Sequence, residues 1–248
     1  DPTAATSALP FVDPGKWVVV EGGLSGSTDD SIIVRDGDGQ IKNRDLLRSK
    51  EQFDPASDHP VHVAGRFTFN TDTDIFTVMT RSNAVSDTSD FGYASQGIKF
   101  EAHMGDSQGQ LYITAKTAAG TQTVLTLSGD ATMNFEVGRA YDFEVFDNGA
   151  NLRLTFTDVA NPSETATVTA TSDFNPSDNY VVINNREEIG STDYKVNLHQ
   201  IDVDQSFVTE EGAAISATLK APSATGTLTY SIISDDTDGG AFSLTNTT

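Results

Sequence analysis

The 248-residue chain contains no cysteine. It therefore has no disulfide bond, no zinc site built on thiolates and no thiol nucleophile. It also lacks an apolar run of about 18 residues, the length that a membrane-spanning helix needs. The opening residues Asp1-Pro2-Thr3-Ala4 carry neither the basic nor the apolar part of a signal peptide. We expect no membrane insertion in this segment, and we expect any signal or anchor to lie outside it.

Basic residues are scarce. The chain has 15 Lys and Arg against 36 Asp and Glu, a formal net charge of -21 and a pI near 4.2. Such a charge repels nucleic acids and anionic membranes, so neither is an expected partner. The acidity leaves two interpretations open, namely solubility alone or carboxylates held together by bound Ca²⁺. A secreted chain without disulfides commonly uses a divalent metal as a substitute crosslink.

Strand patterns run through most of the chain, and no segment has a convincing helical period. Val, Ile, Thr and Phe recur at every second position, and turn sequences such as Asp106–Gly109 and Asp147–Gly149 separate the runs. About thirteen strands over roughly 190 residues predict an all-β fold of two antiparallel sheets. The predicted strands are 17–20, 31–34, 45–49, 61–70, 75–81, 97–103, 110–116, 121–127, 141–146, 152–157, 165–169, 180–184 and 194–203.

The order of these strands carries a resemblance. Trp17–Gly23 opens the series and Val196–Val203 closes it, with the landmarks 46–50, 61–69, 96–101, 139–145 and 152–158 between them. The series resembles a concanavalin A-like (laminin G-like) jelly-roll sandwich that extends from Phe11 to about Asp204. The resemblance implies a pair of sheets with one concave face, where sugars or peptides bind on that face or at the rim loops.

The last residues, Phe207 to Thr248, resemble the opening strands of a cadherin-like repeat. The resemblance rests on Val208–Gly212, the alternating residues 215, 217 and 219, Leu228–Ser234 and Asp235–Leu244. Such repeats occur in large bacterial surface adhesins, so the resemblance implies an extracellular, cell-surface location beside neighbouring repeat domains of the same chain. We expect an extended lead-in at 1–10, a jelly-roll ligand-binding domain at 11–204 and a partial cadherin-like repeat at 205–248.

Acidic residues gather where the two expected domains meet. Asp202 and Asp204 end the last predicted strand, and Glu210 follows within a short connection. By resemblance to cadherin linkers, these hard oxygen ligands imply Ca²⁺ as the cofactor. A solvated acidic linker is the alternative, because the Asp-x-Asn-Asp-Asn stretch of such linkers is absent. The candidate metal ligands are Asp202, Asp204, Glu210, Asp235, Asp236 and Asp238.

The longest predicted loop, 82–95, is the first candidate ligand-binding region, since long loops on rigid β scaffolds often carry recognition. An exposed aromatic ring stacks on a sugar, and Arg, Asp or Asn side chains bind neighbouring hydroxyls. A second polar cluster follows the strand at 180–183, where a surface turn explains the sequence equally well. The candidate residues for a glycan or peptide ligand are Arg81, Asp87, Asp90, Phe91, Tyr93, Asn184, Asn185 and Arg186.

Alternation in the strand 97–103 places Ile98, Phe100 and Ala102 on one face. Lys99, Glu101 and His103 occupy the other face. The simplest expectation is that the apolar row lies in the core and that the charged row is open to water.

No catalytic signature of the related glycan-degrading enzymes is present. A retaining glucanase needs two carboxylates about 5 Å apart on one side of a strand, whereas Glu144 and Asp147 fall on opposite sides. No catalytic residues are therefore assigned. We expect a calcium-assisted, lectin-like module that binds carbohydrate and mediates attachment. A polysaccharide lyase or glucanase of the same fold, or a purely structural spacer, stays as the alternative.

Overall fold

The computed structural model describes residues 16–20, 32–35, 38–41, 46–70, 72, 75–83, 86–87, 93–94, 96–104, 109–117, 121–176, 178–186 and 196–205. None of these residues is helical, so the described part of the chain has no helix able to cross a membrane. The chain divides into two units, residues 1–208 and 209–248. All described residues belong to the first unit. The expected lead-in and cadherin-like repeat lie outside the described residues and stay predictions.

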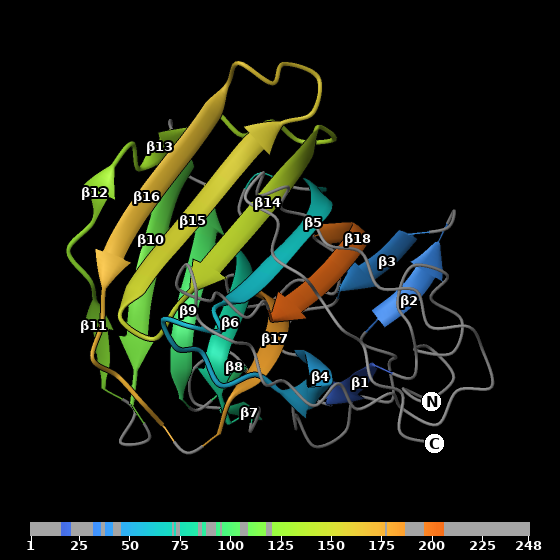
Figure 1. Ribbon diagram of the computed structural model, residues 1–248. Coiled ribbons are helices and arrows are strands. Elements are labelled where there is room, and N and C mark those ends of the chain that lie inside the picture. The colour runs from blue at the N-terminus through green and yellow to red at the C-terminus, as the bar shows by residue number, and fades with distance from the viewer. Residues whose placement is uncertain are drawn as a thin grey trace, which may run out of the picture. The chain divides into compact units, whose positions relative to one another are not determined.

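The described part of this unit forms two sheets of eight strands and a small sheet of two strands (Ser86–Asp87 and Tyr93–Ala94), and all the strand pairs are antiparallel (Figure 1). Sheet A consists, in spatial order, of β1 (Trp17–Val20), β4 (Leu46–Gln52), β17 (Tyr180–Arg186), β6 (Ile75–Ser82), β9 (Gly97–His103), β10 (Gly109–Lys116) and β11 (Gln122–Val124), with β13 (Thr132–Met133) also paired to β10. Sheet B consists of β12 (Ser128–Gly129), β16 (Thr165–Thr171), β15 (Asn151–Asp158), β14 (Ala140–Asp147), β5 (Val61–Phe69), β18 (Val196–Gln205), β3 (Asp38–Ile41) and β2 (Ile32–Arg35).

This arrangement confirms the predicted all-β sandwich, and each of the thirteen predicted strands overlaps an observed one. Five short strands were not predicted. They are β3, β7 (Ser86–Asp87), β8 (Tyr93–Ala94), β12 and β13. Asp38 and Gly39 begin β3, in a stretch that lies between the predicted strands 31–34 and 45–49. These short strands lack β-branched alternation and exist through pairing with a neighbouring strand, which a local pattern does not reveal.

Alternation along the strands separates a shared core from the two outer faces. In β14, buried Tyr141, Phe143 and Val145 alternate with more exposed residues. Phe67 of sheet B stacks on Phe76 of sheet A with ring centroids 4.1 Å apart. Such aromatic pairs add about 0.5–1.5 kcal/mol to the hydrophobic burial of each ring. The core therefore holds the two sheets together face to face.

The charged row on β9 corrects one expectation. Ile98, Phe100 and Ala102 do lie in the core. The side chains of Lys99 and Glu101, however, are only 3% and 6% exposed. Lys99 Nζ lies 3.5 Å from a Glu101 carboxylate oxygen and donates to Gln122 Oε1 at 2.7 Å. Because β9 is flanked by β6 and β10, long side chains of this row pair with one another, and pairing is what permits their burial.

Candidate functional site

A pocket of about 1050 Å³ opens at one end of the sandwich, where strands of both sheets terminate. Its walls come from the segment after β4, from β10 and β11, from the turn between β14 and β15, and from the segment after β16. We call it the end pocket. Its lining residues are 54–57, Arg81, Ala115, Thr117, Thr123, Leu125, 148–150 and 171–175.

A bulge in β6 turns Arg81 toward this pocket. Tyr180 of β17 lies opposite Ser82, whereas Val182 lies opposite Met79, so β6 contains one residue more than its partner. Arg81 has φ 51°, a left-handed conformation that is uncommon for residues other than glycine. The strand alternation is therefore interrupted, and the Arg81 side chain reaches sheet B. It is 2% exposed.

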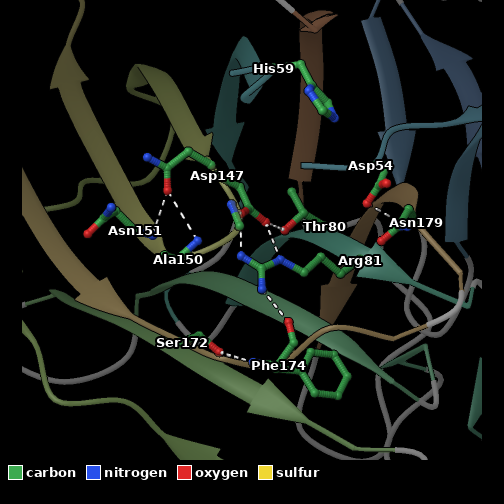
Figure 2. Close-up of polar contacts among 12 residues, drawn as sticks. Asp54, His59, Thr80, Arg81, Asp147, Ala150, Asn151, Ser172, Phe174 and Asn179 are labelled. Carbon is green, nitrogen blue, oxygen red and sulfur yellow. Dashed lines mark hydrogen bonds and ion pairs between the residues drawn. The ribbon is translucent and has the colours of Figure 1, made fainter. Parts of the chain in front are cut away.

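Arg81 and Asp147 form a buried ion pair between the two sheets (Figure 2). Arg81 Nε donates to Asp147 Oδ2 at 2.9 Å, and Arg81 Nη2 donates to Oδ1. Asp147 also accepts hydrogen bonds from Thr80 Oγ1 at 2.6 Å and from the backbone N–H of Gly149 at 2.9 Å. Four hydrogen bonds thus compensate for the lost hydration of one carboxylate, which is the condition for burying a charge without a large penalty.

The same guanidinium fixes the opposite wall of the end pocket. Arg81 Nη1 donates to the backbone carbonyl of Phe174 (Figure 2). The backbone N–H of Phe174 donates to Ser172 Oγ at 3.1 Å, and the N–H of Ser172 donates to the carbonyl of Ala150 at 3.0 Å. Arg81 therefore links the segment after β16 to β14 and to the turn that follows it. The backbone of this wall is set before any ligand arrives.

The turn between β14 and β15 is held equally firmly. Asn148 Oδ1 accepts from the N–H of Asn151 at 2.7 Å and of Ala150 at 3.3 Å. Gly149 has φ +88°, and a Cβ there would lie 2.8 Å from the carbonyl oxygen of Pro55. The turn and the segment after β4 consequently approach as closely as a glycine allows. This contact closes one side of the end pocket.

The lining combines hydrogen-bonding groups with a small apolar surface. Asp54, Asp173 and Asn175 are exposed at the rim. Leu125 and Phe174 are half-buried and supply the apolar part. Carboxylate, amide and hydroxyl groups around an aliphatic and aromatic patch match the alternating hydroxyls and C–H surfaces of a polyhydroxylated ligand.

The structure places the predicted ligand residues in different environments. Arg81 lines the end pocket, but its guanidinium serves the ion pair described above. Asn184 is fully buried in β17. For Asp87, Tyr93, Asn185 and Arg186 the structure gives the strand positions alone, and Asp90 and Phe91 lie outside the described residues. Their proposed role in binding stays a prediction.

The predicted calcium ligands are not brought together by the described residues. Asp202 and Asp204 are exposed, two positions apart on the outer side of β18. Ca²⁺ binds about six to eight oxygen ligands, which is more than two carboxylates supply. Across the described residues, no group of three His, Asp or Glu side chains is placed to hold a metal. The candidates Glu210, Asp235, Asp236 and Asp238 lie outside them.

One cluster on the outer face of sheet A has acid–base character. His103 Nε2 lies 3.9 Å from Glu101 Oε1, and the His103 ring lies 4.5 Å from the Tyr112 ring. The predicted separation of Glu144 and Asp147 is confirmed, because Glu144 is exposed while Asp147 is fully buried. That carboxylate pair does not form a glycosidase dyad.

Sequence reasoning missed most of the end pocket. It assigned Asp147–Gly149 to a turn and left 173–178 as the connection between the predicted strands 165–169 and 180–184. Asp, Asn, Ser and Gly residues marked both segments as irregular. The two segments meet because β14 pairs with β15 and β15 pairs with β16. A local sequence pattern does not show these pairings.

No protein-family model matches this sequence, and no curated protein matches it. The chain does resemble solved structures. One is the CBM2 module of the evolved Dit of Lactobacillus casei BL23 phage J-1, with a TM-score of 0.51 and 9% identity over 82% of this chain and 95% of that one. Another is the alginate lyase from Klebsiella pneumoniae, with a TM-score of 0.53 and 9% identity over 77% and 96% of the two chains. At such identities the likeness shows the fold, and it confirms the predicted concanavalin A-like jelly roll.

Proposed function

We propose that this chain is a carbohydrate-binding module and that the end pocket is its binding site. The observation that carries the proposal is a pocket whose backbone walls are fixed by the Arg81–Asp147 ion pair and whose rim presents hydrogen-bonding groups. The fold supports the proposal, since a carbohydrate-binding module and an alginate lyase share it.

Binding proceeds by covering the half-buried faces of Leu125 and Phe174 with the C–H surface of a sugar. The rim side chains Asp173 and Asn175 then bind its hydroxyls. Asn148 Oδ1 is occupied by backbone N–H groups, so its Nδ2 is the group that it offers to a ligand. Because the walls are preorganised, little conformational entropy is lost when the ligand binds.

Titration of a broad glycan panel by calorimetry tests this function. Asn175→Ala and Asp173→Ala should each weaken binding about threefold to tenfold, the effect of losing one or two hydrogen bonds. Asn134→Ala is the matched control, because Asn134 is an exposed asparagine outside the end pocket. Equal affinity of the Asn175 and Asn134 variants rules out the end pocket. A panel without any binder rules out the function.

The proposal includes an extracellular role in attachment, as a module of a larger surface adhesin. We expect a single site to bind weakly and many copies on a surface to compensate through avidity. In this proposal Asp202 and Asp204 bind Ca²⁺ together with further ligands from outside the described residues. A melting temperature that rises with Ca²⁺ and falls after EDTA treatment supports it. If neither Ca²⁺ nor EDTA changes the melting temperature, the chain does not bind calcium as proposed.

Polysaccharide degradation is the second candidate function, favoured by the cluster of Glu101, His103 and Tyr112. A histidine beside a carboxylate and a phenol supplies groups that move a proton. Incubation with acidic and neutral polysaccharides should then release unsaturated or reducing ends, and His103→Ala should abolish the release. Binding without any release of ends leaves the carbohydrate-binding module alone.

A further inference from the structure

Charge is divided unequally between the two sheets. The strands of sheet A contain six basic residues and two acidic ones, whereas those of sheet B contain three basic and seven acidic ones. The charged residues of sheet A are Arg48, Lys50, Arg81, Lys99, Lys116, Arg186, Glu51 and Glu101. Those of sheet B are Arg35, Arg66, Arg153, Asp38, Asp142, Glu144, Asp147, Asp158, Asp202 and Asp204. A chain of net charge -21 thus keeps one basic sheet.

Part of this positive charge lies at the side of sheet A formed by β1 and β4. The core residues Trp17 and Leu47 alternate with Lys16, Arg48 and Lys50 on the outer face. We call these three residues the basic edge. Lys16 and Lys50 are exposed, and Arg48 is half-buried.

The basic edge brings like charges together. The N–H of Lys50 donates to the carbonyl of Lys16 at 2.7 Å, so the two lysines lie opposite each other on neighbouring segments. Like charges placed directly opposite are destabilising. Neither Lys16 nor Arg48 forms an ion pair with any described residue. Lys16 and Arg48 are therefore two cations without a carboxylate partner among the described residues.

Arg48 is also positioned beside an aromatic ring. Its guanidinium carbon lies 4.6 Å from the centroid of the Tyr180 ring. Arg48 Nε is buried and makes no hydrogen bond. A stacked guanidinium keeps its planar edge in one orientation, which suits a planar carboxylate.

We propose that the carbohydrate bound by this chain is acidic, and that the basic edge binds its carboxylate groups. The inference rests on the proposed function and names its ligand class. An acidic saccharide with carboxylates on separate rings suits the two cations Lys16 and Arg48, which stand on neighbouring segments. A nucleic acid suits them less well, because its dense charge would meet the acidic remainder of the chain.

The basic edge continues toward the end pocket. β4 ends at Gln52, which pairs with Tyr180. Phe53 N donates to the carbonyl of Asn179 at 2.7 Å, and Asp54 already lines the end pocket. The extended run from Arg48 to Asp54 covers about 20 Å at roughly 3.3 Å per residue. A single oligosaccharide can therefore contact the basic edge and the end pocket together.

The test compares oligogalacturonate with the same oligomer after chemical reduction of its carboxylates, using the full chain and calorimetry. Oligogalacturonate should bind at least about tenfold more tightly, and this preference should fall with added salt, as expected for exposed ion pairs. Lys16→Gln and Arg48→Gln should each lower the ratio of the two affinities at least about threefold. Lys16 is exposed, so its variant keeps the test valid if Arg48→Gln fails to fold.

Arg153→Gln is the matched control, because Arg153 also stacks on an aromatic ring but belongs to sheet B. Its guanidinium carbon lies 5.2 Å from the centroid of the Phe146 ring. The affinity of this variant for oligogalacturonate should equal that of the parent chain. Equal binding of the acidic and the reduced oligomer overturns the inference and leaves the proposed function standing. Binding of neither, together with an empty glycan panel, overturns both. A single-stranded oligonucleotide of equal charge that binds as tightly overturns the assignment to a saccharide.

Discussion

Arg81 of β6 and Asp147 of β14 join the two sheets through a bidentate ion pair in which both side chains are almost fully buried. Arg81 reaches this position because a bulge interrupts the alternation of β6. Arg81 lines the end pocket and also donates to the backbone carbonyl of Phe174. One interaction therefore contributes both to sheet packing and to the shape of the candidate site.

Removing the charge of Asp147 should strongly destabilise the fold. Asp147→Asn leaves the Arg81 guanidinium buried without its counter-charge, which costs about 3–5 kcal/mol. Urea unfolding measures the change in the free energy of unfolding. Asp142→Asn is the matched control, because Arg66 binds Asp142 with the same bidentate geometry at 2.6 and 3.0 Å while the two side chains are 42% and 45% exposed.

The control variant should lose no more than about 1 kcal/mol, since water screens an exposed pair. Comparable losses in the two variants would show that burial does not set the strength of the Arg81–Asp147 pair.

Gly149 should tolerate a side chain far less well than Gly138. Both have positive φ, +88° and +78°, so alanine costs about 1 kcal/mol of backbone strain at either position. A Cβ at Gly149 would also lie 2.8 Å from the Pro55 carbonyl oxygen, whereas nothing lies within 4 Å at Gly138. We expect Gly149→Ala to lose about 1–3 kcal/mol more in thermal or urea unfolding, and to weaken ligand binding at the end pocket. Equal losses would contradict the close contact with Pro55.

The fold could be predicted because burial follows a period of two along most strands. Tyr141, Phe143 and Val145 face the core as their spacing requires, and the same holds for Ile98 and Phe100. Hydrophobic alternation is a local signal, so it is readable without the partner strands.

The candidate site could be predicted only in part, because it depends on departures from that period and on distant pairs. The bulge at Arg81 exists only in register with β17. Glu101 and Lys99 have a charged pattern typical of a solvated face, yet contacts with Thr114 and Gln122 accompany their burial. Asp147 gives no local sign that its partner lies 66 positions earlier.

Asp130 should make the stability of the fold depend on acid pH. The backbone N–H and the hydroxyl of Thr132 donate to Asp130 Oδ1 at 3.0 and 2.9 Å, and they lower the pKa of the carboxyl group. A lowered pKa in the folded state adds stability above the unfolded value of about 3.9. That contribution is lost as the pH falls through the folded pKa.

Urea unfolding of the parent chain and of Asp130→Asn, measured from neutral to strongly acidic pH, isolates this contribution. The parent chain should be the more stable of the two near neutral pH, and the difference should shrink toward acid. A difference that stays constant across the series would exclude Asp130 as its source.

Tyr141 should produce the opposite dependence at alkaline pH. Its ring is fully buried, with its centroid 4.9 Å from that of the Phe135 ring. Its hydroxyl oxygen accepts a hydrogen bond from the backbone N–H of Glu136 at 2.7 Å. Burial raises the pKa of the phenol, because the phenolate is poorly hydrated there. The folded chain therefore keeps a proton that the unfolded chain loses above a pH of about 10. The associated stability is complete below that pH and is lost as the pH rises through the folded pKa.

The Tyr141→Phe variant keeps the ring and has no proton to lose, so its free energy of unfolding should fall less steeply than that of the parent chain above a pH of about 10. Parallel curves for the two chains would mean that other groups cause the alkaline loss.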